Sequence, residues 1–143
     1  KGFEMFGKIE QETNGYHWAQ YMLGDCYDGG HGTKKNDTKS FQWYSKSIKS
    51  NVSNGPAMYN VGRCYEDGRG ATKDLNKARE FYTKAAAQGH VEAIYNVGRC
   101  YEEGLGVIKD SSKAREWYIR AAAQGHAGAK QEIKVKKAKK KKK

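Results

Sequence analysis

The sequence is poor in three features that would each point to a different class of protein: proline, cysteine and long apolar runs. It holds one proline and three cysteines in 143 residues. Since no apolar run approaches the roughly 20 residues that span a bilayer, the sequence predicts no membrane span. No signal peptide is visible either, although the chain starts at Lys1 rather than at an initiator methionine, so a leader or further repeats can precede it.

Acidic residues are absent from the C-terminal stretch. Between Lys134 and Lys143 the chain carries eight lysines and no Asp or Glu, so this stretch supplies most of the net charge of +11. The rest of the chain is close to charge balance. A partner preference drawn from the basic composition therefore belongs to the tail alone.

Motifs for catalysis, metal binding and phosphate-binding loops are missing as well. The histidines, His17, His31, His90 and His126, have no metal-binding spacing, and no Cys-x-x-Cys occurs. The glycines at 29–32 follow no strand and precede no Gly-Lys-Ser/Thr, so they suit a turn better than a phosphate cradle. The sequence therefore predicts no catalytic residue, metal, cofactor or small-molecule substrate. His90 and His126, which share one repeated position, are interpreted as turn residues.

What the chain does contain is an internal repeat. The segment from Ala57 to Gly70 returns 36 residues later as Ala93 to Gly106, and Tyr-Asn-Val-Gly-Arg-Cys-Tyr-Glu is identical in both. A weaker copy starts at Ala19, 38 residues before the first of these. Self-similarity at a period of this size indicates a stack of supersecondary units in which each unit contacts only its neighbours.

Each unit is predicted to form two helices, A and B. Helix B shows apolar residues at i, i+3, i+4, i+7 and i+8, and it follows an aspartate N-cap at Asp74 and Asp110. Pro56 suits the first turn of a helix A, and Gly89 suits a left-handed cap after a helix B. The predicted units are the end of a preceding repeat at 1–14, repeats at 15–54, 55–90 and 91–126, a capping helix at 127–137 and a lysine-rich tail at 138–143.

The three cysteines, Cys26, Cys64 and Cys100, occupy the same place in successive repeats. Equivalent atoms of stacked helices lie about 10 Å apart, whereas a disulfide needs Cα atoms within about 7 Å. We therefore expect three reduced, buried cysteines, which suits an intracellular, cytoplasmic protein. Gly62 and Gly98, two positions before Cys64 and Cys100, are expected where helices cross closely.

At these residues the chain resembles the Sel1-like repeat, a relative of the tetratricopeptide repeat. The motif is Ala-x-Tyr-Asn-Val-Gly-x-x-Tyr-x-x-Gly-x-Gly, followed by Lys-Asp-x-x-Lys-Ala-x-x-(Phe/Trp)-Tyr-x-(Lys/Arg)-Ala-Ala-x-x-Gly, and the resemblance covers about 15–131. The first repeat departs from it, with Asn36 for the aspartate and Ser40 and Ser47 for alanines. The resemblance implies an all-α, right-handed α-solenoid that acts as a non-enzymatic scaffold or adaptor, with a protein or peptide ligand on its concave side.

On a helical wheel, one face of helix A lies opposite the core face. In the arrangement that the chain resembles, this face lines the groove, and we predict that it binds the ligand: Tyr59, Asn60, Arg63, Glu66, Tyr95, Asn96, Arg99 and Glu102. Aromatic residues and arginine dominate interface energetics. A purely structural role is the alternative, because Arg63 and Glu66 have the spacing of an i, i+3 ion pair and the tyrosine recurs in every repeat. Asp25 replaces the arginine in the first repeat, so the groove is expected to run from acidic to basic.

The lysine tail has three interpretations: a solvated or helical extension of the cap, a contact with nucleic acid or a ribosome, or a contact with another acidic partner. The second gives the alternative function, an RNA-associated protein whose lysines neutralise phosphates. The lysines concerned are Lys134, Lys136, Lys137, Lys139, Lys140, Lys141, Lys142 and Lys143.

Overall fold

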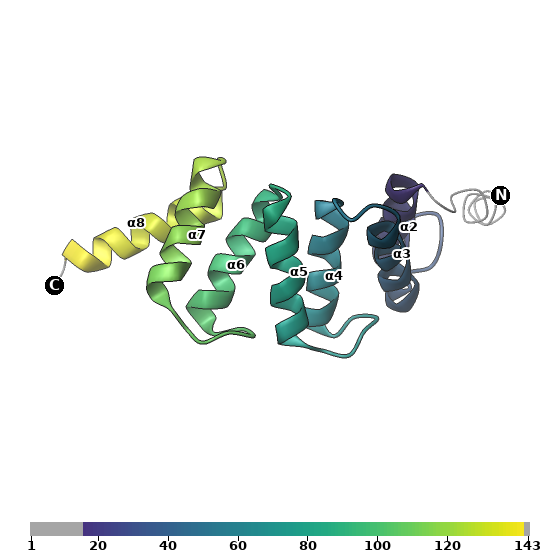
Figure 1. Cartoon of the computed structure of the whole chain (residues 1–143), viewed down its shortest axis with the longest axis horizontal. Coiled ribbons are helices and arrows are strands. Elements are labelled where there is room, and N and C mark those ends of the chain that lie inside the picture. The colour runs from purple at the N-terminus through teal and green to yellow at the C-terminus, as the bar shows by residue number, and fades with distance from the viewer. Residues whose placement is uncertain (1–15, 142–143) are drawn as a thin grey trace.

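The protein's computed structural model describes residues 16–141, and this part of the chain consists of helices joined by turns (Figure 1). The helices follow one another in a row from one end of the molecule to the other. Their bounds are α2 His17–Gly29, α3 Asp37–Ser50, α4 Gly55–Asp67, α5 Leu75–Ala87, α6 Val91–Glu103, α7 Ser111–Ala123 and α8 Ala127–Lys141. The helix predicted at 2–12 and the turn predicted at 13–15 lie outside the described residues.

The helices pair as the repeat predicts. Helix α2 packs on α3, α4 on α5 and α6 on α7, and successive pairs meet through α3 with α4 and α5 with α6. Helix α8 packs on α7 and projects from the end of the row (Figure 1). The predicted all-α solenoid with a C-terminal capping helix is therefore confirmed. Helix α8 continues to Lys141, beyond the predicted bound at 137, as expected from the interpretation of the tail as a helical extension of the cap.

Side-chain caps fix where the helices begin. Asp74 and Asp110 each accept the backbone N–H of the third residue of the following helix B, as predicted, and Asn36 does the same in the first repeat. Such a cap is worth about 1 kcal/mol relative to alanine. At the start of helix A, the equivalent acceptor is Asn54 in α4 and His90 Nδ1 in α6. The predicted turn position of His90 is thus an N-cap.

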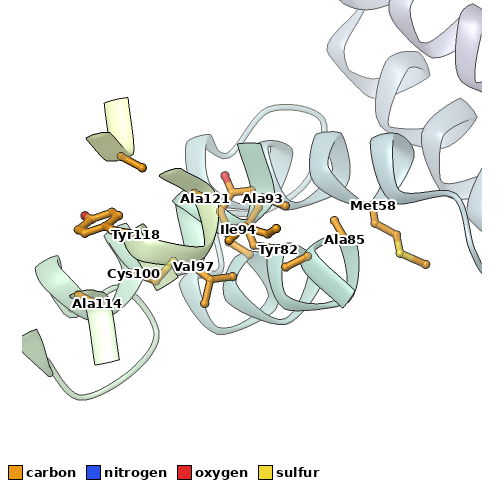
Figure 2. Packing of buried hydrophobic residues seen from close by; sticks show 13 residues of the cluster. Met58, Tyr82, Ala85, Ala93, Ile94, Val97, Cys100, Ala114, Tyr118 and Ala121 are labelled. Carbon is orange, nitrogen blue, oxygen red and sulfur yellow. The ribbon is translucent and has the colours of Figure 1, made fainter. Parts of the chain in front are cut away.

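Small side chains bring the helices together, and tyrosines fill the space between them (Figure 2). Ala85, Ala93 and Ala121 have no exposed surface, and the rings of Tyr82 and Tyr118 are 1% exposed. Figure 2 shows this cluster continuing from α4 through the following helices. Burial of these aromatic rings is a main source of stability, since each removes a large apolar area from water.

Cys64 and Cys100 are buried at 3% and 1% exposure, and all three cysteines are free thiols. Cys26, which is also expected to be buried, has an intermediate exposure and is less covered than the other two. Burial is the main cause that raises the pKa of both buried thiols, and charged groups of the preceding repeat lie close enough to contribute, among them Asp28 for Cys64 and Glu66 for Cys100. Cys26 belongs to the first described repeat, so within residues 16–141 no earlier repeat covers it.

Close crossings between the two helices of a repeat occur at the predicted glycines. A Cβ atom added to Gly62 would lie 2.8 Å from the ring of Tyr82, and one added to Gly98 would lie 2.9 Å from the ring of Tyr118. These distances leave no room for a side chain, so glycine permits the close approach of helix A to helix B. None of the helices in the described part of the chain has the length and apolar character needed to cross a bilayer.

Candidate functional site

The eight residues predicted to bind a ligand lie on α4 and α6, and we call them the A-helix face. The structure brings part of the set together across the junction between repeats 2 and 3, where Arg99 binds Glu66 and Asn96 interacts with Tyr59. Arg63 instead contacts Tyr59 of its own helix. Tyr59, Asn60, Arg63, Glu66, Tyr95, Arg99 and Glu102 are partly buried, and Asn96 is 7% exposed. Most of these residues make hydrogen bonds, ion pairs or ring contacts with neighbouring helices of the solenoid. These contacts distinguish the residues that hold the repeats together from those that remain available to a partner.

The carboxylates of the A-helix face accept hydrogen bonds from buried tyrosines. The Tyr82 hydroxyl donates to Glu66 Oε1 at 2.8 Å, and the Tyr118 hydroxyl donates to Glu102. Burial, reinforced by these carboxylates, raises the pKa of both tyrosines, so the phenols stay neutral donors. In the first repeat the corresponding Tyr44 hydroxyl donates instead to Asp25, at 2.5 Å.

The same carboxylates also bind a cation of the following unit. Arg99 Nη2 lies 2.6 Å and 2.8 Å from the two carboxylate oxygens of Glu66, and its Nη1 lies 3.2 Å from Glu103. Lys136 of α8 takes the equivalent role toward Glu102, at 3.3 Å. Glu66 therefore joins repeat 2 to repeat 3, and Glu102 joins repeat 3 to the cap. The alternative ion pair between Arg63 and Glu66 is not formed, because Glu66 is taken by Arg99.

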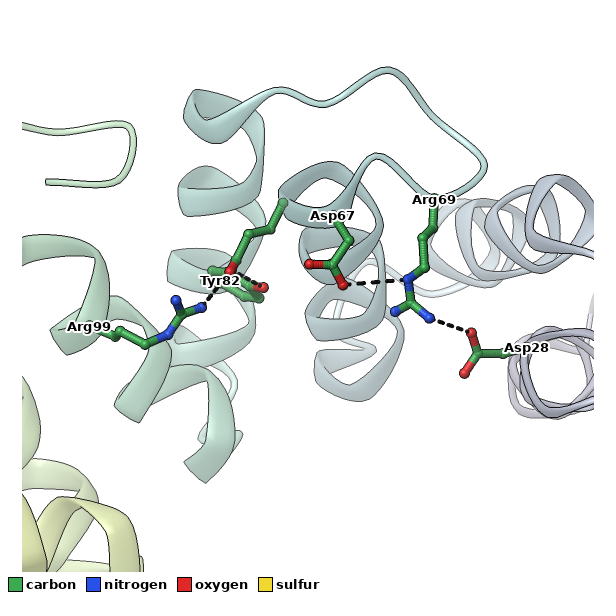
Figure 3. Close-up of polar contacts among 6 residues, drawn as sticks. Asp28, Asp67, Arg69, Tyr82 and Arg99 are labelled. Atoms are coloured by element: carbon green, nitrogen blue, oxygen red, sulfur yellow. Dashed lines mark hydrogen bonds and ion pairs between the residues drawn. The ribbon is translucent and has the colours of Figure 1, made fainter. Parts of the chain in front are cut away.

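Arg63 differs from Arg99 because its two expected carboxylates are occupied. Asp28 and Asp67 correspond to Glu66 and Glu103, but Arg69 lies between them, 3.3 Å from Asp28 and 3.4 Å from Asp67 (Figure 3). Repeat 3 has Leu105 in place of Arg69, so nothing there competes for Glu66 and Glu103. Within residues 16–141, Arg63 makes no ion pair, and its guanidinium lies 5.9 Å from the centre of the Tyr59 ring.

The tyrosines of the A-helix face stack on the histidine caps. The rings of Tyr59 and His90 are 4.7 Å apart between centroids, and those of Tyr95 and His126 are 4.4 Å apart. Burial raises the pKa of Tyr59 and lowers that of His90. Asn96 lies within hydrogen-bonding reach of the Tyr59 hydroxyl. These contacts explain why the tyrosine recurs: it packs the end of one repeat against the next.

The tail lysines as far as Lys141 lie on α8, and apart from Lys136 they are exposed. Lys142 and Lys143 lie outside the described residues. In the described part of the chain, no group of three His, Cys, Asp or Glu side chains is placed to hold a metal ion. The sequence reasoning missed Arg69, the residue that decides which arginine is unpaired. The sequence does show the difference, because this loop position holds Arg69 in repeat 2 and Leu105 in repeat 3, although the two repeats are otherwise similar.

Comparisons with known proteins identify the repeat and find solved structures with the same fold. The Sel1 repeat profile matches three times, at residues 19–52, 55–90 and 91–126. A Sel1 repeat protein from Oxalobacter formigenes, of known crystal structure, is 34% identical over 90% of this chain and 96% of its own, with a TM-score of 0.78. None of the curated proteins compared with this chain matches it.

Two further solved structures share the fold. The protein c5321, described as a protective antigen present in uropathogenic Escherichia coli strains, is 33% identical with a TM-score of 0.80. The match covers 89% of this chain but 26% of that one. Cysteine rich protein B of Helicobacter pylori is 25% identical over 87% of this chain and 93% of its own, with a TM-score of 0.67. With three matched repeats, and with the helices of residues 16–141 packed as such repeats, the chain belongs to the Sel1 repeat family.

Proposed function

We propose that this protein is an intracellular, non-enzymatic scaffold that binds an acidic segment of a partner protein on the A-helix face. Membership of the Sel1 repeat family supports a role in protein interaction, because such repeats typically mediate it. The three free thiols suit a reducing compartment. The partner contact is centred on Arg63, at the junction between the first and second repeats.

The observation that carries this proposal is the unpaired guanidinium of Arg63. A guanidinium group donates charge-assisted hydrogen bonds to carboxylates, as Arg99 does through Nη2 to both carboxylate oxygens of Glu66 and through Nη1 to Glu103. Arg63 has the same position in its repeat but no such partner among the described residues, and it rests over an aromatic ring that limits its motion. Because Asp28 is bound to Arg69, a carboxylate from another chain can pair with Arg63 in its stead.

The surroundings of Arg63 suit an extended peptide. Tyr21 and Asn60 interact with each other across the junction between the first two repeats, and the amide of Asn60 has hydrogen-bonding groups beyond the one that Tyr21 uses, which can pair with a peptide backbone. Asp25 lies one repeat earlier and accepts from Tyr44. We therefore expect the acidic group of the partner opposite repeat 2 rather than repeat 1, in the direction of the predicted change from acidic to basic. This electrostatic match contributes more to orientation than to affinity.

Arg63→Glu tests the proposal, with Arg120→Glu as a control that makes the same charge change on helix α7. A partner is first identified by affinity capture and mass spectrometry, and its dissociation constant is then measured by calorimetry. Arg63→Glu is expected to weaken binding more than tenfold, about 1.4 kcal/mol, and Arg120→Glu less than twofold. Retained affinity in folded Arg63→Glu, or an equal loss in both variants, would exclude this site.

A further inference from the structure

A basic hollow lies between the start of α7 and the C-terminal half of α8. It has a volume of about 450 Å³ and is lined by Ser111, Ser112, Arg115, Lys136, Lys139 and Lys140. We call it the α7–α8 cleft. Four of its six lining side chains are cations and the other two carry hydroxyls, so its walls present hydrogen-bond donors and positive charge.

Contacts within the fold hold the walls of the cleft in place. Lys136 is anchored by Glu102, 3.3 Å from its Nζ, and lies over the Tyr118 ring at 5.1 Å. The side chain of Asp110 accepts the backbone N–H of Lys113, which fixes the first turn of α7 where Ser111 and Ser112 lie. The carboxylates of Asp110 and Glu102 are thus engaged with protein groups.

Helix α8 extends the positive charge beyond the cleft. Lys134, Lys137 and Lys141 follow one another at helical spacing and lie exposed, and Lys134, Lys137, Lys140 and Lys141 border a second hollow. Like charges three or four residues apart on a helix repel each other by a few tenths of a kcal/mol per pair. A bound polyanion would relieve this repulsion along several turns, whereas a single small anion would reach only the cleft.

We propose that the α7–α8 cleft and the lysines of α8 bind the phosphate backbone of a nucleic acid, without reading its bases. Lysine, arginine and hydroxyl groups are the side chains that contact phosphates in such complexes. The cleft is lined by no aromatic side chain, so it offers no surface on which bases stack. After Val135 the only apolar residue of α8 is Ala138, so the helix lacks the apolar face of a membrane-surface helix.

Salt-dependent binding of a fluorescein-labelled oligouridine, measured by fluorescence anisotropy, tests this inference. Each phosphate contact in a single strand contributes about 0.7 to the slope of log K against log salt. The variant Arg115→Gln/Lys139→Gln/Lys140→Gln should therefore lower the slope by about two and weaken binding at least tenfold at low salt. It spares Lys136, whose ion pair with Glu102 supports the cap.

A matched control removes the same charge elsewhere, with Lys34→Gln/Lys35→Gln/Lys49→Gln. The slope of log K against log salt for this control should stay unchanged. An equal loss in both triple variants would show that only net charge matters and would overturn the site.

Other polyanions test the choice of a nucleic acid. Competition by polyglutamate as strong as that by oligouridine would assign the cleft to acidic proteins instead, and binding to anionic vesicles alone would assign it to membranes. Either result overturns the proposal, as does an affinity for oligoadenosine that differs more than threefold. Arg63→Glu should leave oligouridine binding unchanged, so this test is independent of the A-helix face.

Discussion

A buried tyrosine hydroxyl needs an acceptor, and each helix B tyrosine of this chain finds one on helix A of its own repeat. Tyr82 and Tyr118 use the glutamates that also bind the next unit, whereas Tyr44 uses Asp25. A hydrogen bond to a charged group contributes about 1.5–3 kcal/mol, and leaving its partner unsatisfied costs a similar amount. The carboxylates of helix A are therefore part of the framework, even though their positions suit a ligand groove.

His90 makes stability depend on pH. Burial lowers its pKa below the usual value near 6.5, and the neutral ring accepts the Ala93 N–H at Nδ1. The unfolded chain then binds a proton more readily than the folded one. The stability that His90 contributes should be complete above about pH 6.5 and should fall as the pH drops below it. Urea unfolding at pH 7.5 and 5.5 measures this.

A matched substitution isolates the effect of His90. Asn54 occupies the equivalent cap position in α4 and does not titrate. His90→Asn should keep the cap and show a smaller loss of stability between the two pH values. If wild type and variant lose the same free energy of unfolding, the pH dependence arises elsewhere.

The cysteines should differ in reactivity. Burial raises the pKa of Cys64 and of Cys100 to about 11, and both side chains are inaccessible. Cys26 is half-buried, and burial together with Asp25 raises its pKa. Only Cys26 should react with a thiol reagent in the native protein, slowly because its thiolate is scarce. Mass spectrometry after timed labelling with and without denaturant measures this, and rapid native labelling of Cys100 would contradict the described packing.

At the scale of the helices, packing within a repeat depends on glycine. A side chain at Gly62 would meet both the Tyr82 ring and the carbonyl oxygen of Ala78, 3.2 Å from its Cβ. Since the backbone of α5 cannot move without disturbing its core, Gly62→Leu should cost at least about 1–3 kcal/mol. Thermal unfolding measures this, and Ala123→Leu, at an exposed helical position, is the control with little expected change. An unchanged melting temperature for Gly62→Leu would contradict the close crossing.

Helices and their order are predictable from this sequence, whereas the pairing of long side chains is not. The period from Ala57 to Ala93 and the caps at Asp74 and Asp110 depend on local residues, and the structure confirms them. Whether Arg63 forms an ion pair depends on Arg69, a residue outside the helix that binds the two carboxylates Arg63 would otherwise use. Whether a carboxylate binds one arginine or another is decided by three-dimensional proximity, which helical periodicity does not contain.

The sequence left the length of α8 open between several interpretations for a related reason. Consecutive lysines repel one another and favour an early end to the helix. Lys136 is nevertheless held by Glu102 and Tyr118 of repeat 3, and the last turn places Lys139, Lys140 and Lys141 near the negative end of the helix dipole. Tertiary contact and dipole together outweigh the repulsion, which a local pattern does not show.

Across the whole molecule, the apolar core is divided unequally. One cluster extends from Met58 in α4 to Ala129 in α8, while Leu23 and Tyr27 form a separate cluster in the first repeat. In a solenoid, stability is the sum of repeat and interface terms, so a weaker interface permits partial opening. We expect the amides of α2 and α3 to exchange with solvent at a lower free energy of opening than those of α5 and α6. Native-state hydrogen exchange measures this, and uniform protection would contradict it.

The ion pair between Arg99 and Glu66 is the clearest difference between the two junctions. Arg99 Nη2 contacts both carboxylate oxygens of Glu66, and the two side chains are 27% and 21% exposed, so water screens the pair incompletely. Arg99→Met leaves Glu66 with only the Tyr82 hydroxyl and should cost about 1–2 kcal/mol in urea unfolding. Arg63→Met removes no ion pair and should change stability by less than about 0.5 kcal/mol.

The two arginines occupy identical positions in nearly identical repeats, so the contributions of helix propensity and local sequence cancel when the two variants are compared. A difference between the variants therefore reports the capture of Asp28 and Asp67 by Arg69, and Arg69→Leu should abolish that difference by freeing both carboxylates for Arg63. Equal costs in Arg99→Met and Arg63→Met would show that the inter-repeat ion pair contributes nothing to stacking.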